Sequence, residues 1–177
     1  MSSPIDQDKD VAVGITLPLR LGNSGYFEQS YTTLEQVKSN VINLLLTIPG
    51  ERYMQPDFGS NLYKHLFEQL DEFVIEEIQD SIKDALEIWL PFVIIEKLEV
   101  TDGGDLNDNQ SYHTIKVSLD ISIKADPDAT ANITFKALET GNISVESRSY
   151  YGSAEGQKSN KSMVETYKEV NRFSGNL

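Results

Sequence analysis

Residues 112–124 place the strongest constraint on the fold of this chain, because apolar and polar side chains alternate there without a break. Five aliphatic residues occupy one set of alternate positions, and five polar residues occupy the other: Ile115, Val117, Leu119, Ile121 and Ile123, against Lys116, Ser118, Asp120, Ser122 and Lys124. Successive side chains of a strand point to opposite faces of its sheet. The pattern therefore predicts a strand with one buried face and one solvated face.

Two more strands are predicted beside this one, at residues 92–101 and 130–138. The connections read DGGDLNDNQ and DPDA, and their Asp, Asn, Gly and Pro content is typical of turns. Connections of this kind join neighbouring antiparallel strands. We therefore expect an antiparallel meander with one long loop and one tight turn.

Two stretches before these strands show helical spacing of their apolar residues. Thr32 and Glu35 form a capping box at the start of the first stretch, and Gly50 is the expected C-terminal cap. The second stretch, residues 71–90, has an acidic outer surface and ends at Pro91. A shorter helix is expected after Ser60. The prediction is an α+β fold, with helices on one face of a small, mainly antiparallel sheet.

The two ends of the chain differ from this body. Residues 11–21 alternate as a half-buried strand would, and Pro18 restricts that strand to a sheet edge or an extended arm. We assign residues 1–138 to one α+β domain with this N-terminal arm. Residues 139–177 form a polar extension with a short strand near Val145 and a short helix after Ser162. A single short helix is marginal in water, so it packs on a partner or frays.

Charge and composition exclude several function classes. The chain has 28 acidic and 15 basic residues, a net charge of −13, which disfavours nucleic acid and anionic membrane surfaces as partners. It has no cysteine, so disulfides and thiolate metal sites are excluded, and His65 and His113 lack metal-site spacing. No apolar run reaches the ~20 residues that cross a bilayer. The first ten residues lack a secretory signal pattern, so we expect a cytosolic protein. From the missing metal-site patterns we expect no metal or cofactor.

Residues 47–67, TIPGERYMQPDFGSNLYKHLF, are unusually rich in charged and aromatic groups for a turn. Glu51 and Asp57 could be drawn as the carboxylate pair of a glycosidase, but 28 acids produce many such pairs by chance. We favour a docking surface in which Glu51 and Arg52 anchor the loop or contact a partner. Trp89 either closes the core or joins the interface. The expected partner-binding residues are Glu51, Arg52, Pro56, Phe58, Gly59, Phe67, Trp89, Pro91 and Phe92.

The sequence GERYMQPDFGSNLYKHLFEQ is followed by a long acidic helix, a Trp-x-Pro corner and strands ending in KADPDATANITFKAL. This order, over residues 11–138, resembles the baseplate wedge proteins that initiate the sheath of contractile phage tails. That family is sometimes labelled lysozyme-like and has relatives in type VI secretion baseplates. The resemblance implies a structural protein without catalytic residues, whose domain resembles the strand-exchange domain of tail sheath proteins.

The resemblance also implies partners and a location. The first sheath subunits would add strands to edges of the sheet, by the arm at residues 11–21 or the edge of the 112–138 hairpin. Partners would be the tail sheath protein and the wedge and tube-adjacent proteins. Multiple copies would surround the tail tube in the virion baseplate, after assembly in the host cytoplasm. A peptidoglycan-degrading glycosidase of a phage tail and a free acidic adaptor are the alternatives.

One departure from the family pattern concerns the corner after the long helix. The family usually carries a Glu-Pro-Arg triplet there, which binds the wedge core, whereas this chain has Leu90, Pro91 and Phe92. The corner has become apolar. We therefore expect an apolar partner surface at this position, or a transfer of the charged role to Glu51 and Arg52.

Overall fold

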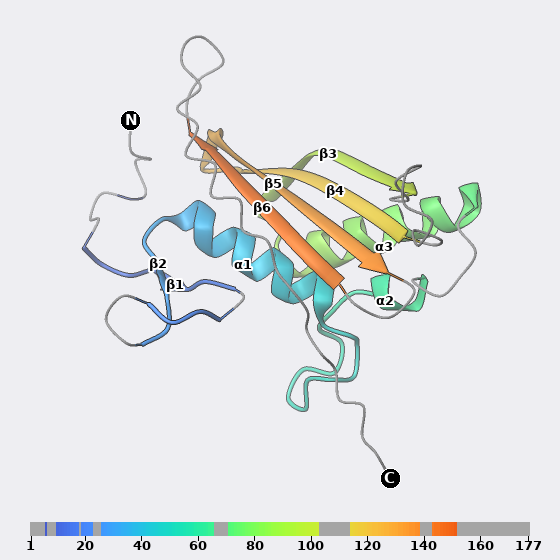
Figure 1. Cartoon of the computed structure of the whole chain (residues 1–177), viewed down its shortest axis with the longest axis horizontal. Coiled ribbons are helices and arrows are strands. Elements are labelled where there is room, and N and C mark those ends of the chain that lie inside the picture. Colours follow the sequence, from blue (N-terminus) through green and yellow to red (C-terminus); the bar gives the residue numbers. More distant parts are fainter. Residues whose placement is uncertain are drawn as a thin grey trace.

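A computed structural model describes residues 6, 10–17, 19–22, 26–65, 71–102, 114–138 and 143–151. A four-stranded sheet carries helices on one face, and a small N-terminal hairpin lies at one end of the first helix (Figure 1). In chain order the elements are β1 (Gly14–Ile15), β2 (Gln29–Ser30), α1 (Thr33–Leu46), α2 (Leu62–His65), α3 (Glu72–Trp89), β3 (Val93–Asp102), β4 (Thr114–Ile123), β5 (Asp126–Leu138) and β6 (Ile143–Tyr151).

The sheet is an antiparallel meander in the order β3-β4-β5-β6, which confirms the predicted α+β fold. The alternate aliphatic residues of β4 are buried against the helices, as their spacing predicted. The DPDA segment is not the turn: Lys124 and Ala125 form it, and Asp126 already pairs with Ile123. The β4–β5 register shifts beside Pro127, so Pro127 has no partner residue in β4. Its lack of an N–H donor therefore costs no ladder hydrogen bond.

A β-bulge at Glu96 explains why β3 has no simple alternation. Ile95 pairs with Ile121, but Lys97 already pairs with Asp120, so Glu96 is the extra residue. Before the bulge Val93 and Ile95 pair with inward-facing residues of β4, and after it Leu98 and Val100 do so. The bulge therefore keeps all four aliphatic side chains on the core face. The Glu96 carboxylate accepts a hydrogen bond from Ser122 Oγ at 2.6 Å.

The two long helices begin as predicted, but α1 ends differently. Thr32 Oγ1 accepts from the Glu35 backbone N–H at 3.3 Å, and the Asp71 carboxylate accepts from that of Val74 at 2.8 Å. The C-terminal cap of α1 is Thr47, not Gly50. Thr47 leaves the helix in an extended conformation, and its N–H and hydroxyl both donate to the Asn43 carbonyl, at 3.1 and 2.5 Å. This satisfies the helix end before Gly50 is reached.

β6 pairs with β5 from Ile143 to Tyr151, so the predicted short strand near Val145 is present and the sheet continues past Leu138. The predicted helix after Ser162 lies outside the described residues, as do Phe67 and His113. Among the helices of the described part of the chain, none combines the length and apolarity needed to cross a membrane.

The N-terminal arm is a hairpin, and the prediction of half-burial for its strand was wrong. Gly14 pairs with Ser30, and this pair faces α1: Ser30 Oγ donates to Gln36 Oε1 at 2.7 Å. A Cβ on Gly14 would lie 2.1 Å from the same Gln36 oxygen. The strand therefore turns its small, polar side toward α1. Its apolar side faces away from the core, with Val13 51% and Ile15 46% exposed.

Candidate partner-binding surface

The loop at residues 47–60 is a set of nested turns between α1 and α2. The Gly50 N–H donates to the Pro56 carbonyl at 2.7 Å, and the Gln55 N–H donates to the Arg52 carbonyl at 3.2 Å. The Ser60 N–H donates to the Thr47 carbonyl at 3.0 Å and closes the base of the loop. These bonds satisfy the backbone within the loop itself. A loop held in this way presents its side chains without a large ordering cost on binding.

Gly59 makes the closed base possible. Its φ is +130°, and a Cβ at this position would lie 2.3 Å from the Thr47 carbonyl oxygen. Gly59 is buried. This predicted site residue therefore shapes the loop and does not itself present a side chain to a partner.

A stack of three side chains joins the loop to the end of α3. The Arg52 guanidinium carbon lies 3.7 Å from the Phe58 ring centroid, in cation–π contact. Phe58 in turn meets Trp89 edge-on, with ring centroids 5.1 Å apart and an interplanar angle of 64°. The structure thus brings together three of the predicted site residues. Phe58 and Trp89 pack against the protein's own core, which favours the core-closing interpretation of Trp89.

Replacing Phe58 with alanine should detach the loop from α3. The change removes a partly buried ring and both of its contacts, so we expect a loss of about 2–3 kcal/mol of stability. Trp89 is the only tryptophan in the chain, so its emission should shift to longer wavelength as water reaches the indole. Arg52→Ala is the matched control, because it removes only a cation–π contact worth about 1 kcal/mol or less at such a site. An unchanged Trp89 spectrum in the Phe58 variant would contradict the stack.

The tip of the loop carries two large apolar side chains that the sequence interpretation did not include. Tyr53 is 97% exposed and Met54 is 87% exposed. The exposed Pro56 lies beside them. Glu51 serves the backbone, since its Oε2 accepts a hydrogen bond from the Ile48 N–H at 3.2 Å. The tip is therefore a rigid apolar projection on an anchored base, a form suited to a pocket on another protein.

The corner after α3 is a second exposed apolar surface. The Val93 N–H donates to the Leu90 carbonyl at 2.9 Å, and Lys124 donates its N–H to the Phe92 carbonyl at 3.0 Å. The Lys124 ammonium also donates to the Pro91 carbonyl. With the backbone fixed, Phe92 remains 41% exposed and Ile88 70% exposed. Phe92 stands at the last position of the corner, where the resembled family usually carries a charged triplet, and Ile88 lies just before the corner in α3. Both side chains face solvent.

These surfaces hold little that could perform chemistry. Asp57 is exposed, Glu51 is engaged with the loop backbone, and the described residues contain no cluster of three His, Cys, Asp or Glu that could bind a metal. A small pocket lies between the ends of α1, α2 and the sheet and has no carboxylate in its lining: Leu45, Leu46, Leu62, Tyr63, Ile115, Val117, Phe135, Ala137 and Ile143. On the solvated part of β3, a hydrogen bond to Glu99 raises the pKa of the Lys97 ammonium.

In the part of the chain that the structure describes, the outer strands of the sheet are β3 and β6, not the strands of the 112–138 hairpin named from the sequence. Both strands of that hairpin are covered, because β3 pairs along β4 and β6 pairs along β5. The bulge at Glu96 interrupts the β3 edge, and the charged Lys97 and Glu99 pair beside it at 2.7 Å. β6 pairs through nine consecutive residues without a register shift. It is the more regular of the two edges.

Comparisons with known proteins agree with this architecture. Residues 32–128 match a family described as baseplate wedge protein gp25. A chain of the anti-feeding prophage baseplate, solved by cryo-EM with sixfold symmetry, is similar over 62% of this chain and 83% of its own, at 17% identity and a TM-score of 0.52. That likeness shows a shared fold.

Two further solved structures are similar at lower TM-scores. A chain of the postcontracted pyocin R2 baseplate matches with 21% identity over 59% of this chain and 97% of its own, at 0.44. A protein of Geobacter sulfurreducens, provisionally named a tail lysozyme, matches with 17% identity over 71% and 96%, at 0.39. No curated protein sequence matches the chain.

Proposed function

Because the chain belongs to the family of baseplate wedge protein gp25, we propose that it is the baseplate component on which the sheath of a contractile tail begins to assemble. Membership makes it a structural component of a tail baseplate, located in the virion. The family match includes α1, the 47–60 loop, α3, β3 and β4, which together carry the loop tip and the corner.

The observation that carries the sheath step is the outer edge of β6, along which no other described residue forms a ladder. An edge strand presents a row of unpaired N–H and C=O groups to which another chain can add a strand. β6 offers nine residues in one register, whereas the bulge at Glu96 twists and interrupts β3. The first sheath subunits therefore add their strands beside β6. Main-chain hydrogen bonds supply the affinity, and alternate side chains fix the register.

The loop tip and the corner serve a different set of partners. Tyr53 and Met54 on the loop and Phe92 on the corner insert into apolar surfaces of neighbouring wedge and tube-adjacent proteins. Glu51 and Arg52 hold the loop in place for this contact, through the Ile48 N–H and the Phe58 ring. Multiple copies of the chain surround the tail tube. The role is structural and needs no catalytic group.

A density map of the intact baseplate tests this function. We expect β6 to lie about 4.8 Å from a strand of a first-ring sheath subunit, the usual spacing of paired strands. We expect Tyr53 and Met54 to be covered by a wedge protein in the same map. A map that placed the chain away from the first sheath ring would contradict the proposal.

A glycosidase gains no support from the geometry. The carboxylate of Glu51 accepts a hydrogen bond from the loop backbone, and Asp57 is exposed on the turn. The general acid of a glycosidase sits in an apolar, enclosed site, and neither residue lines the small pocket.

A further inference from the structure

The N-terminal hairpin turns an apolar surface away from the rest of the chain. Eight of its large apolar side chains are exposed, along both arms of the hairpin: Val11, Val13, Ile15, Leu19, Leu21, Tyr26, Phe27 and Tyr31. We call this set the hairpin face. Polar contacts hold the hairpin to α1, through Ser30 with Gln36 and through the Leu17 N–H with Ser39 Oγ at 3.1 Å. An exposed apolar patch of this kind marks an interaction site.

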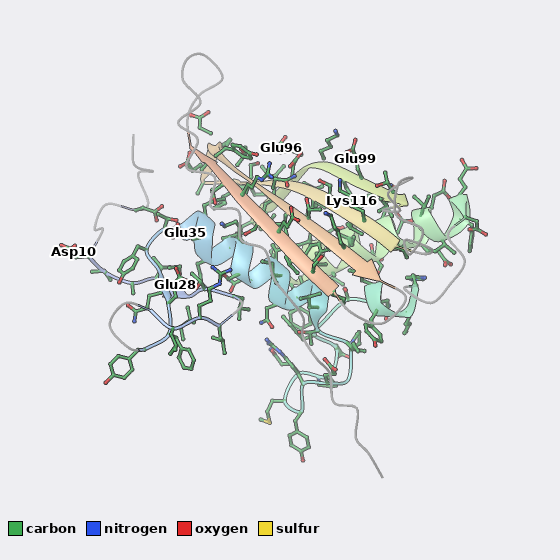
Figure 2. The ribbon with its side chains drawn as sticks, viewed as in Figure 1. Asp10, Glu28, Glu35, Glu96, Glu99 and Lys116 are labelled. Atoms are coloured by element: carbon green, nitrogen blue, oxygen red, sulfur yellow. The ribbon has the colours of Figure 1, made fainter. Side chains whose placement is uncertain are left out.

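Carboxylates surround the hairpin face. Asp10 precedes β1, Glu28 precedes β2, and Glu35 lies in the first turn of α1 (Figure 2). All three stand at the same end of the molecule, and the hairpin itself carries Arg20, so the three carboxylates outnumber this one exposed hairpin cation. The Glu35 carboxylate also accepts a hydrogen bond from the Tyr31 N–H at 3.4 Å. A complementary ligand has an apolar stripe flanked by basic groups.

The strand β6 ends at this same end of the molecule. Ile143, at the start of β6, lines a pocket with Leu45 and Leu46 from the last turn of α1. α1 packs along β6, so the other end of β6, at Tyr151, lies toward the first turn of α1 and the hairpin (Figure 1). β6 therefore ends at the end of the molecule that carries the hairpin.

The chain after Tyr151 contains a segment with the required chemistry. Residues 158–172 hold four basic residues and two acidic ones. Lys158 and Lys161 supply the excess just before residue 162, and within residues 162–172 two basic residues balance two acidic ones. Met163, Val164, Tyr167 and Val170 recur at helical spacing behind the capping box of Ser162 and Glu165. A lone amphipathic segment of this length needs an apolar surface to form a stable helix.

We propose that residues 162–172 dock on the hairpin face of the same chain, with Met163, Val164, Tyr167 and Val170 against its apolar side chains. The 11 residues from Tyr151 to Ser162 span up to about 36 Å when extended, so the segment can reach the whole face. A short tether gives an effective concentration of about 1 mM, which favours docking even when the intrinsic affinity is weak. The hairpin face and residues 162–172 both lie outside the 32–128 family match. Two parts added to the family domain together would show this arrangement.

The absence of native cysteines permits a direct test by disulfide trapping in the full chain. The test variant carries Ile15→Cys with Tyr167→Cys, and the matched control carries Ile15→Cys with Glu165→Cys, on the opposite side of the predicted helix. Docking brings the two cysteines of the test pair within disulfide distance, so they should oxidise about tenfold faster than the control pair. The product should run in the monomer band of a non-reducing gel. An unchanged Trp89 emission spectrum confirms that each variant is folded.

Three results would overturn the proposal. Equal oxidation rates for the Tyr167 and Glu165 pairs would show that the segment meets the hairpin face without presenting one particular side to it. Absence of any disulfide would show that the segment does not reach the hairpin face. Disulfides confined to the dimer band would show that a neighbouring copy supplies the segment.

Discussion

Replacing Gly59 with valine should lower the free energy of unfolding by about 3 kcal/mol or more, because backbone strain and a steric clash act together. The φ of +130° is nearly restricted to glycine, and a β-branched side chain tolerates it least. The Cβ would lie 2.3 Å from the Thr47 carbonyl oxygen and 3.1 Å from the Pro49 nitrogen. Both are backbone atoms, and the Thr47 oxygen already accepts the hydrogen bond from Ser60 that closes the loop.

Thermal unfolding followed by circular dichroism measures this loss. For a chain of this size about 1 kcal/mol corresponds to 2–4 °C, so we expect the Tm to fall by roughly 6–12 °C. Gly50→Val is the matched control: its φ is +97°, but outside Gly50 and its two chain neighbours no atom of the described residues lies within 4 Å of the place a Cβ would take, so mainly the backbone strain remains. The Gly50 variant should therefore lose about half as much or less. Equal losses at Gly50 and Gly59 would show that the clash with Thr47 is relieved by movement of the loop base.

Local patterns predicted most of the fold because the sheet and helices follow simple periods. The alternation in residues 112–124 placed Ile115 and Ile123 on the core face of β4, where both are buried. The same period gave a wrong prediction at residues 11–21, where most of the alternate apolar side chains are exposed instead of half-buried. Periodicity states which side chains share a face, but not which face meets the core. At the hairpin, Gly14 and Ser30 face α1: Ser30 Oγ donates to Gln36 Oε1, and the missing side chain of Gly14 leaves room for the same Gln36 side chain.

The candidate site was harder to predict because its geometry depends on contacts between distant residues. Arg52, Phe58 and Trp89 were chosen for their chemistry, but nothing in the sequence places the Phe58 ring between a loop cation and the end of α3. Tyr53 is one of the aromatic groups that make the loop unusual, but it was not among the expected partner-binding residues. The nested turns that expose it and Met54 appear only in the folded loop.

Strand order decides which strands form the outer edges of the sheet, and the sequence does not specify that order. Apolar and polar residues alternate in the 112–138 hairpin, and from this we predicted that its edge could accept a further strand. Once β3 and β6 pair on either side, that hairpin becomes the centre of the sheet. The bulge at Glu96 then separates the two remaining edges, because an irregular edge is a poor template for strand addition.

Under the proposed function, a proline at one of two neighbouring positions of β6 should reduce sheath assembly without unfolding the protein. Neighbouring N–H groups of a strand point to opposite sides, so of Arg148 and Ser149 one donates toward β5 and the other toward the outer edge. Proline at the first kind of position removes a ladder hydrogen bond and lowers the Tm. Proline at the second kind is tolerated, as on other sheet edges, yet it removes a donor that the incoming sheath strand needs.

We therefore expect Arg148→Pro and Ser149→Pro to separate stability from assembly. One variant should melt near the wild-type temperature and still give sheathed tails reduced by about tenfold or more, because a buried carbonyl of the sheath strand loses its donor. Sheathed tails are counted by electron microscopy. Arg148→Ala and Ser149→Ala are the matched controls, because they remove the same side chains and keep both N–H groups. Normal sheaths from the proline variant that keeps its fold would exclude the β6 edge as the acceptor, because the added strand would then need no donor from it.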